Sequence, residues 1–123
     1  MKIPKQINWY KRPKPHDYPA AQSFLSLLYA DPRALQLLKE LKRAPVVQFK
    51  AKDIFCASGL PLLGISNSHV AKDRKKIKKG ISLSPVLLVR EAFISKGVIA
   101  DCYHRLCAVY SFDKDAIIPC KIV

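Results

Sequence analysis

The sequence predicts an α+β fold in which a helical hairpin precedes a small sheet with flanking helices. Two segments between residues 20 and 43 carry leucines at helical spacing, which indicates a pair of short amphipathic helices. Apolar runs at 85–89 and 116–123 are rich in branched residues and are typical of buried strands. Near residue 101 a third apolar run changes to helical spacing, which indicates a strand followed at once by a helix.

Size and composition are those of one domain. The 123 residues are 50% hydrophobic, which is enough to bury a core. No apolar run approaches the roughly 20 residues that a membrane-spanning helix needs, so we expect no membrane insertion. No apolar segment follows the basic N-terminus, so we expect no secretory signal and a cytoplasmic, bacterial-type location. The four cysteines form no CxxC pair, and in that setting we expect them to be reduced.

The charge of the chain is strongly positive, with 22 basic and 9 acidic residues and a formal charge of +13. Two clusters contribute most of it: Lys2, Lys5, Lys11, Arg12 and Lys14, and then Lys72, Arg74, Lys75, Lys76, Lys78 and Lys79. Such a balance favours anionic partners and speeds encounters with them. A solvated face that serves only solubility explains the same pattern. The charge alone does not choose between a nucleotide, a nucleic acid and an acidic protein.

Residues 1–19 are predicted to form an extended basic arm. Four prolines in this segment exclude a continuous helix. Trp9 and Tyr10 would attach the arm either to the body of the domain or to a partner.

Residues 20–45 are predicted to form the helical hairpin. The first helix spans 20–29, and its apolar face consists of Phe24, Leu25, Leu27 and Leu28. The second helix begins at Asp31 and Pro32, with Asp31 as the N-cap, and ends before Pro45. Its apolar stripe consists of Ala34, Leu35, Leu37, Leu38 and Leu41.

The remaining segment, 46–123, is predicted to hold the sheet. The expected elements are a strand at 46–49, a helix at 52–57 ended by Gly59, a basic helix at 69–79 ended by Gly80, strands at 85–89 and 98–101 joined through a turn at 95–97, a helix at 104–112 and a strand at 116–123. Ser66, Asn67 and Ser68 offer N-cap side chains to the basic helix. Its inner face would consist of Val70, Asp73 and Ile77.

The junction between residues 101 and 105 carries the strongest functional signal. A helix N-terminus has unpaired N–H groups and the positive end of the helix dipole, which together attract anions. Arg105 adds a planar guanidinium that suits phosphate oxygens, and His104 adds a donor that can also transfer protons. We therefore predict a site for a phosphate-bearing ligand, first of all a nucleotide.

Three stretches resemble the ParB/sulfiredoxin superfamily: 83–90 (LSPVLLVR), 101–105 (DCYHR) and 118–123 (IPCKIV). The resemblance covers roughly residues 46–123 and implies a ParB/sulfiredoxin-like small mixed sheet with flanking helices. In this superfamily the middle box holds nucleotide phosphates. The chain is most similar to small bacterial members that have Asp-Gly-Tyr-His-Arg in the box and no established activity.

The resemblance implies a nucleotide, ATP or CTP, bound together with Mg²⁺. It places the ligand contacts at Ser68, His69, Cys102, Tyr103, His104 and Arg105. Asp101 would hold Mg²⁺ beside the phosphates, because hard cations bound to phosphates take few protein carboxylates. Asp101 and His104 are then the candidate catalytic residues of a small phosphotransferase.

Two positions depart from the superfamily pattern. Residue 102 is cysteine where relatives have glycine, and a side chain there either strains the turn or occupies ligand space. Ligand binding would then be weakened or lost. Sulfiredoxins have their nucleophilic cysteine directly before His-Arg, and that position is Tyr103 here, so we expect no sulfiredoxin activity.

Each candidate residue also has a purely structural interpretation. Arg105 would form a surface ion pair with Asp101 or Asp113, and Asp101 would be the N-cap of the helix. His104 would be an ordinary structural histidine, and capping alone would explain Ser68.

Two other classes of function remain open. The basic arm and the helix at 69–79 suit a nucleic-acid-binding or ParB-like nuclease module, whose affinity would fall steeply with added salt. The last class is an inactive interaction domain, in which Cys102 marks the loss of the ligand site.

Overall fold

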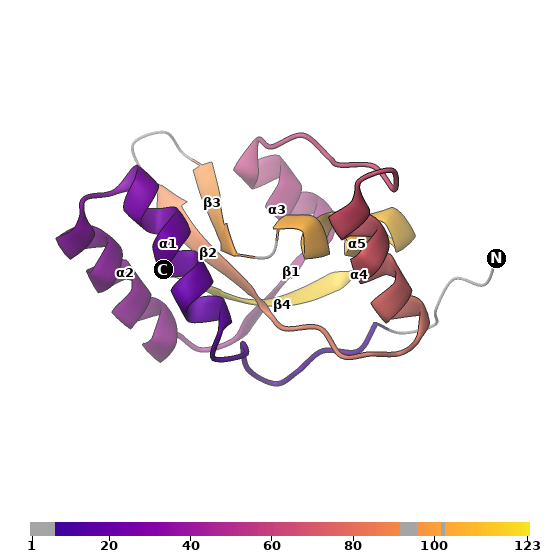
Figure 1. Cartoon of the computed structure of the whole chain (residues 1–123), viewed down its shortest axis with the longest axis horizontal. Helices are drawn as coiled ribbons and strands as arrows, with labels where there is room; N and C mark the ends of the chain where they lie inside the picture. Colours follow the sequence, from indigo (N-terminus) through magenta and orange to yellow (C-terminus); the bar gives the residue numbers. More distant parts are fainter. Residues whose placement is uncertain (1–6, 92–95, 102) are drawn as a thin grey trace.

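The computed structural model describes residues 7–91, 96–101 and 103–123, within which the chain forms five helices and a four-stranded sheet (Figure 1). The α+β class predicted from the sequence is confirmed. The elements are α1 (Asp17–Leu28), α2 (Asp31–Arg43), β1 (Val47–Lys50), α3 (Ala51–Ser58), α4 (Ser68–Lys78), β2 (Val86–Glu91), β3 (Lys96–Asp101), α5 (Tyr103–Phe112) and β4 (Ile117–Ile122). None of the described helices is long and apolar enough to cross a membrane.

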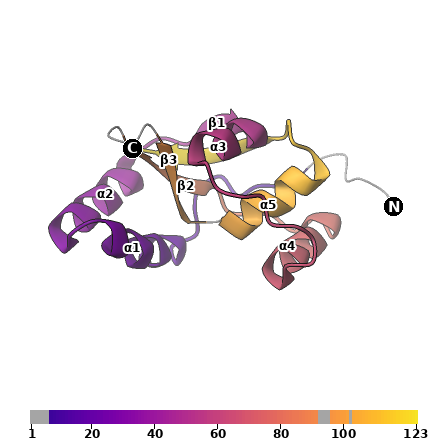
Figure 2. The ribbon, with the colours of Figure 1, turned by 90° about the horizontal axis from the view of Figure 1, so that it is seen from above.

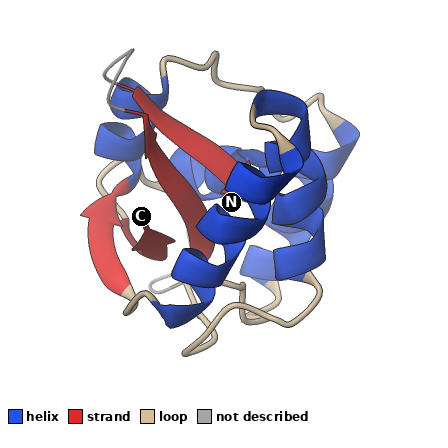
Figure 3. Ribbon diagram, turned by 90° about the vertical axis from the view of Figure 1, so that its left-hand side faces the viewer, coloured by secondary structure: helices blue, strands red, loops and turns tan. Residues whose placement is uncertain are grey.

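The sheet is mixed, with the strand order β1-β4-β2-β3. Figure 3 shows its strands in red among the blue helices. β2 and β3 form the predicted antiparallel hairpin, and β1 pairs with β4 in the antiparallel sense. β2 and β4 run parallel, with Val86 opposite Cys120 and Leu88 opposite Ile122. Parallel neighbours need a crossover connection, which β3 and α5 supply here.

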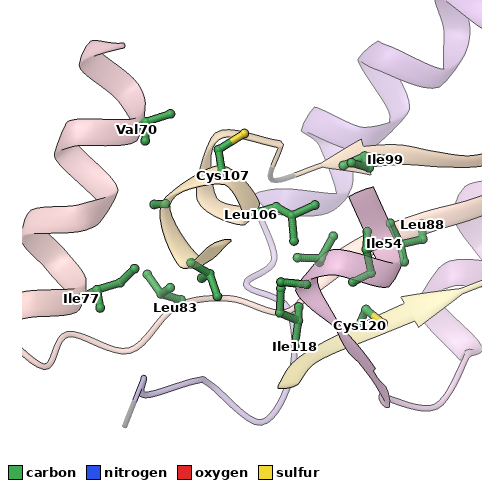
Figure 4. Close-up of a cluster of buried hydrophobic side chains, with 14 residues drawn as sticks. Ile54, Val70, Ile77, Leu83, Leu88, Ile99, Leu106, Cys107, Ile118 and Cys120 are labelled. Atoms are coloured by element: carbon green, nitrogen blue, oxygen red, sulfur yellow. The ribbon is translucent and has the colours of Figure 1, made fainter. Parts of the chain in front are cut away.

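Strand β2 contributes side chains to two apolar clusters. Val86 and Leu88 pack with residues of α3, α4 and α5, whereas Leu87 and Val89 pack with α1 and α2. Successive strand residues point to opposite faces, so the continuous apolar run reflects a strand covered on both sides. Figures 1 and 2 show the α1–α2 pair and α4 at opposite ends of the molecule, with the sheet between them. Figure 4 shows the first cluster, in which side chains from α3, α4, α5 and the strands converge.

Helix α1 differs from its prediction in both its start and its inner face. It begins at Asp17, three residues earlier than expected, because a proline in the first turn removes only an N–H that has no helical partner. The inner face contains Ala21 and Leu25, whereas Phe24, Leu27 and Leu28 are exposed, and Leu27 is 83% exposed. The predicted apolar face was therefore wrong except at Leu25. The small side chain of Ala21 lies on the side that packs on α2 and the sheet.

Helix α2 follows its predicted bounds closely. Asp31 is its first residue rather than its N-cap, because Ala30 occupies the cap position and Pro32 lies in the first turn. The predicted stripe is buried except at Leu35, which is exposed.

The arm attaches to the body of the domain. Trp9 forms a parallel bridge with Leu83, and the Tyr10 N–H donates to the Leu83 carbonyl at 2.7 Å. The Asn8 side-chain amide donates to the Gly80 carbonyl at 2.9 Å. The described part of the arm therefore lies against the connection between α4 and β2.

Local sequence signals determine where several of the remaining elements begin and end. Gly59 and Gly80 follow α3 and α4 with positive φ values of 66° and 73°, as their predicted stop roles require. Asn67 caps α4, since its side-chain oxygen accepts from the N–H groups of His69 and Val70. The predicted turn at 95–97 was wrong at residues 96 and 97, which already belong to β3, and Ser95 lies outside the described residues.

Candidate functional site

The strand-to-helix junction lies where the sequence predicts it. β3 ends at Asp101, which pairs with Leu87 beside an irregularity in the register, and α5 begins at Tyr103. The helix begins two residues after Asp101, so Asp101 does not directly precede it. Cys102, predicted to contact the ligand, lies outside the described residues.

A pocket of about 240 Å³ opens beside this junction, between α4 and the first turn of α5. The residues that line it are His69, Lys72, Asp73, Lys76, Asp101, Tyr103, His104 and Arg105. Five of these belong to the predicted site, and two segments more than 20 residues apart in the sequence contribute them. Ser68, the sixth described candidate, is an exposed first residue of α4 and falls outside this set of lining residues.

One face of α4 forms the outer wall of the pocket. Residues 69, 72, 73 and 76 recur at helical spacing, which places their side chains on one face. Lys72, Asp73 and Lys76 were not among the predicted site residues. The spacing from His69 was the signal that could have identified them, although it does not show which neighbour they face.

Cationic groups outnumber carboxylates around the pocket. Its lining contains three cationic side chains, Lys72, Lys76 and Arg105, and two carboxylates, Asp73 and Asp101. Lys76 Nζ lies 3.9 Å from Asp73 Oδ1, a loose contact between partly exposed groups. Such exposed pairs contribute little to stability, so the lysine can exchange this contact for a ligand at small cost.

The two histidines of the pocket lie side by side. The ring centroids of His69 and His104 are 4.8 Å apart with an interplanar angle of 42°. Each is the second residue of its helix, so the N-terminal ends of α4 and α5 both border the pocket. Imidazole nitrogens at such a place can donate to an anion.

Tyr103 forms a wall of the pocket and not a polar contact within it. Its hydroxyl donates to the carbonyl of Pro61, and its ring lies 5.7 Å from that of His104 and 6.5 Å from that of Phe55. Burial raises the pKa of Tyr103, and its contact with Cys107 raises it further. The hydroxyl therefore stays protonated and holds the loop at 60–65 against α5.

Arg105 contacts both the pocket and the N-terminal part of the chain. Its Nη1 donates to the Ser84 carbonyl at 2.6 Å and lies 4.0 Å from Asp17 Oδ2. Asp17 is the first residue of α1, and the sequence did not indicate it as a partner of Arg105. No local pattern connects these residues, because α1 and α5 are distant in the sequence and meet only in the folded chain.

Metal ligation would depend on few protein groups. Among residues 7–91, 96–101 and 103–123, no group of three or more His, Cys, Asp and Glu side chains lies in a position to hold a metal ion. Asp101 and Asp73 are the two carboxylates that line the pocket. Mg²⁺ bound to phosphate oxygens needs only one or two carboxylates, so these residues fit that mode of binding alone.

Comparisons with known proteins leave the assignment of function to this geometry. No family model matches the chain, and no curated protein or solved structure matches it.

Proposed function

We propose that this protein binds a phosphate-bearing ligand, first of all a nucleotide, in the pocket between α4 and α5. One observation carries the proposal: around a single cavity the pocket gathers imidazole side chains from two helix starts, Arg105 from the first turn of α5, and lysines from one face of α4. Helix N-termini favour anions, and lysine and arginine are the usual cationic partners of phosphate. The resemblance to the ParB/sulfiredoxin superfamily supports the same location, since its phosphate-binding box corresponds to residues 101–105.

The size of the pocket limits what it encloses. Pockets that enclose a whole small molecule usually measure roughly 300–1,000 Å³. At about 240 Å³ this cavity suits the phosphate groups of a nucleotide, with the sugar and base lying outside it along the surface.

Each polar residue has a distinct part in this proposal. Lys72 and Lys76 supply positive charges from α4, and the adjacent rings of His69 and His104 supply donors where the two helix starts meet. Arg105 supplies a guanidinium from the first turn of α5.

Phosphoryl transfer is an extension of the same proposal. A bound Mg²⁺ would neutralise phosphate charge, with Asp101 as its protein ligand. His104 would accept the proton of an acceptor hydroxyl, because an imidazole nitrogen can act as a general base.

A specific observation favours nucleic acid as the second candidate ligand. The described part of the arm lies against Gly80 and Leu83, directly after α4, so Lys11, Arg12 and Lys14 of the first basic cluster adjoin the connection that follows the second cluster. Lys75, Lys78 and Lys79 are exposed there, whereas Arg74 packs on α5, with its guanidinium 4.1 Å from the Phe112 ring centroid. Phosphate contacts of these lysines would make binding sharply salt-dependent.

A thermal-shift panel separates the candidates. The wild type, His104→Ala, Arg105→Ala and Lys75→Gln are heated with ATP, ADP or CTP, with and without Mg²⁺, and with short oligonucleotides. Each variant without ligand is its own reference. A ligand at 100 times its Kd stabilises the folded state by about 2.7 kcal/mol, which raises the Tm by several degrees.

Nucleotide binding predicts a rise for at least one nucleotide that His104→Ala and Arg105→Ala reduce and Lys75→Gln does not. A response to oligonucleotides alone, reduced most by Lys75→Gln, would replace the proposal with nucleic-acid binding. If neither nucleotides nor oligonucleotides change the Tm, the inactive interaction domain is the remaining class of function.

A further inference from the structure

Asp17 is a carboxylate buried at the start of α1, with its side chain 3% exposed. Burying an ionised carboxylate is costly unless donors or cations surround it. The Ser84 hydroxyl donates to Asp17 Oδ2, and His16 Nε2 lies 3.3 Å from Asp17 Oδ1. The backbone N–H of Lys14 in turn donates to Ser84 Oγ at 2.9 Å. One polar cluster therefore holds together the arm, the start of α1 and the connection before β2.

Arg105 connects this cluster to the pocket. Its Nη1 contacts the Ser84 carbonyl and approaches Asp17, while the same side chain lines the pocket beside His104. The Arg105 side chain is 19% exposed, so protein atoms surround most of it. Arg105, which lines the pocket, thus contacts Ser84 and Asp17, two described residues that lie outside the pocket lining and far from Arg105 in the sequence.

We propose that Asp17 is a positioning residue for Arg105, and that docking of the arm, which reaches Asp17 through the Lys14 N–H and the Ser84 hydroxyl, thereby sets the affinity of the pocket for phosphate groups. The part that concerns the ligand rests on the function proposed above. An arginine side chain has many rotamers, and fixing it before the ligand arrives removes an entropic cost from binding. The 2.6 Å hydrogen bond to the Ser84 carbonyl, together with the charge of the Asp17 carboxylate 4.0 Å away, restricts the guanidinium in this way.

Coupling between two sites acts equally in both directions. If the docked arm strengthens ligand binding, the bound ligand strengthens arm docking by the same factor. Local opening of the arm is measurable as amide hydrogen exchange. The Lys14 N–H, which donates to Ser84 Oγ, should therefore exchange more slowly when the pocket is occupied.

The test compares Asp17→Asn with Asp31→Asn. Asp31 is the first residue of α2, as Asp17 is of α1, but it is exposed and separated from Asp17 by the length of α1. Calorimetry with inorganic pyrophosphate measures affinity in the wild-type and Arg105→Lys backgrounds. We expect Asp17→Asn to weaken binding about tenfold in the first background and to have no further effect in the second. Asp31→Asn should leave the affinity unchanged.

A second readout needs no ligand. The Nε–Hε signal of Arg105 in a ¹⁵N spectrum, assigned by its loss in Arg105→Lys, reports whether the guanidinium is fixed. We expect an ordered signal in the wild type and in Asp31→Asn, and an averaged signal in Asp17→Asn. If Asp17→Asn does not fold, exchange of the Lys14 N–H in the wild type decides the coupling, and pyrophosphate should slow it.

The outcomes separate the two proposals. An equal loss of affinity in both backgrounds, or an Arg105 signal that stays ordered in Asp17→Asn, overturns the positioning role. Exchange at Lys14 that bound pyrophosphate leaves unchanged overturns the coupling to the arm. A wild type that binds no pyrophosphate refutes the proposed function, whereas the Arg105 signal still decides whether Asp17 positions Arg105.

Discussion

The imidazole rings of His69 and His104 lie with their centroids 4.8 Å apart, and this contact joins the starts of α4 and α5. The two helices come from segments of the chain that the sequence separates by β2 and β3. Their packing creates a pocket with donors on both sides. The functional proposal depends on this meeting of two helix starts more than on either residue alone.

The lysines of the pocket wall should contribute to affinity in a position-dependent way. Lys76→Gln removes a charge that lines the pocket, and we expect it to weaken pyrophosphate binding about threefold to tenfold, the range for partly exposed charged contacts. Lys75→Gln is the matched control, because Lys75 directly precedes Lys76 in the sequence, is exposed and does not line the pocket. Calorimetry at fixed ionic strength measures both. Equal losses for the two variants would show that general charge, and not the pocket, attracts the ligand.

The inner face of α1 leads to a stability prediction. Leu25 is fully buried, so Leu25→Ala should lower the free energy of unfolding by about 2–5 kcal/mol. Leu27 is 83% exposed, and Leu27→Ala should change it by less than about 0.5 kcal/mol. Urea denaturation of both variants provides the comparison. A larger loss of unfolding free energy for Leu27→Ala than for Leu25→Ala would support the apolar face of α1 that the leucine pattern predicted.

Elements whose signals are local could be predicted from the sequence. The Asn67 cap and the stop glycines act on neighbouring residues, and the strand-to-helix change at residues 101–103 is visible in the apolar spacing. The face of α1 could not be chosen in this way. Its leucines permit more than one apolar face, and only the sheet and α2 select the row that contains Ala21 and Leu25.

The candidate site was likewise predictable only in part. Residues 101–105 stand together in the sequence, so their shared location needs no knowledge of the fold. The contribution of Lys72 and Lys76 depends on how α4 packs on α5. The partners of Arg105 are Asp17 at the start of α1 and Ser84 before β2, and these distant segments meet at Arg105 only in the folded chain.

The left-handed conformation of Gly59 provides a test of the α3 ending. Gly59 has φ 66°, and a Cβ there would meet Lys96 Cε at 3.3 Å. Gly59→Ala should therefore destabilise the protein by about 1 kcal/mol. Gly64→Ala is the control, because a Cβ at Gly64 meets nothing within 4 Å. Thermal unfolding should show a lower Tm for Gly59→Ala than for Gly64→Ala, and the reverse order would be inconsistent with this backbone.

The Cys120 thiol predicts a loss of stability at alkaline pH. Burial raises the pKa of Cys120 from 9.0 to about 11. Between these values the folded state keeps the proton and the unfolded state releases it, so the free energy of unfolding falls as pH rises. This single group accounts for a loss of about 2 kcal/mol by pH 11.

Urea denaturation from pH 8 to pH 11 measures this effect in the wild type and in Cys120→Ala. The raised pKa values of Tyr29 and Tyr103 act in the same direction in both proteins. The free energy of unfolding of Cys120→Ala should therefore also fall over this pH range, but by less than that of the wild type. Parallel declines in the two proteins would contradict the raised pKa of Cys120.

The most direct test of ligand binding in the pocket follows the three histidines of the chain by NMR during a titration with pyrophosphate and ATP. His69 and His104 line the pocket, whereas His16 lies at the start of α1 outside its lining. We predict saturable shifts of the His69 and His104 ring signals that share one Kd and exceed any shift of His16. Shifts that do not saturate and are equal in all three rings would contradict a phosphate site between α4 and α5.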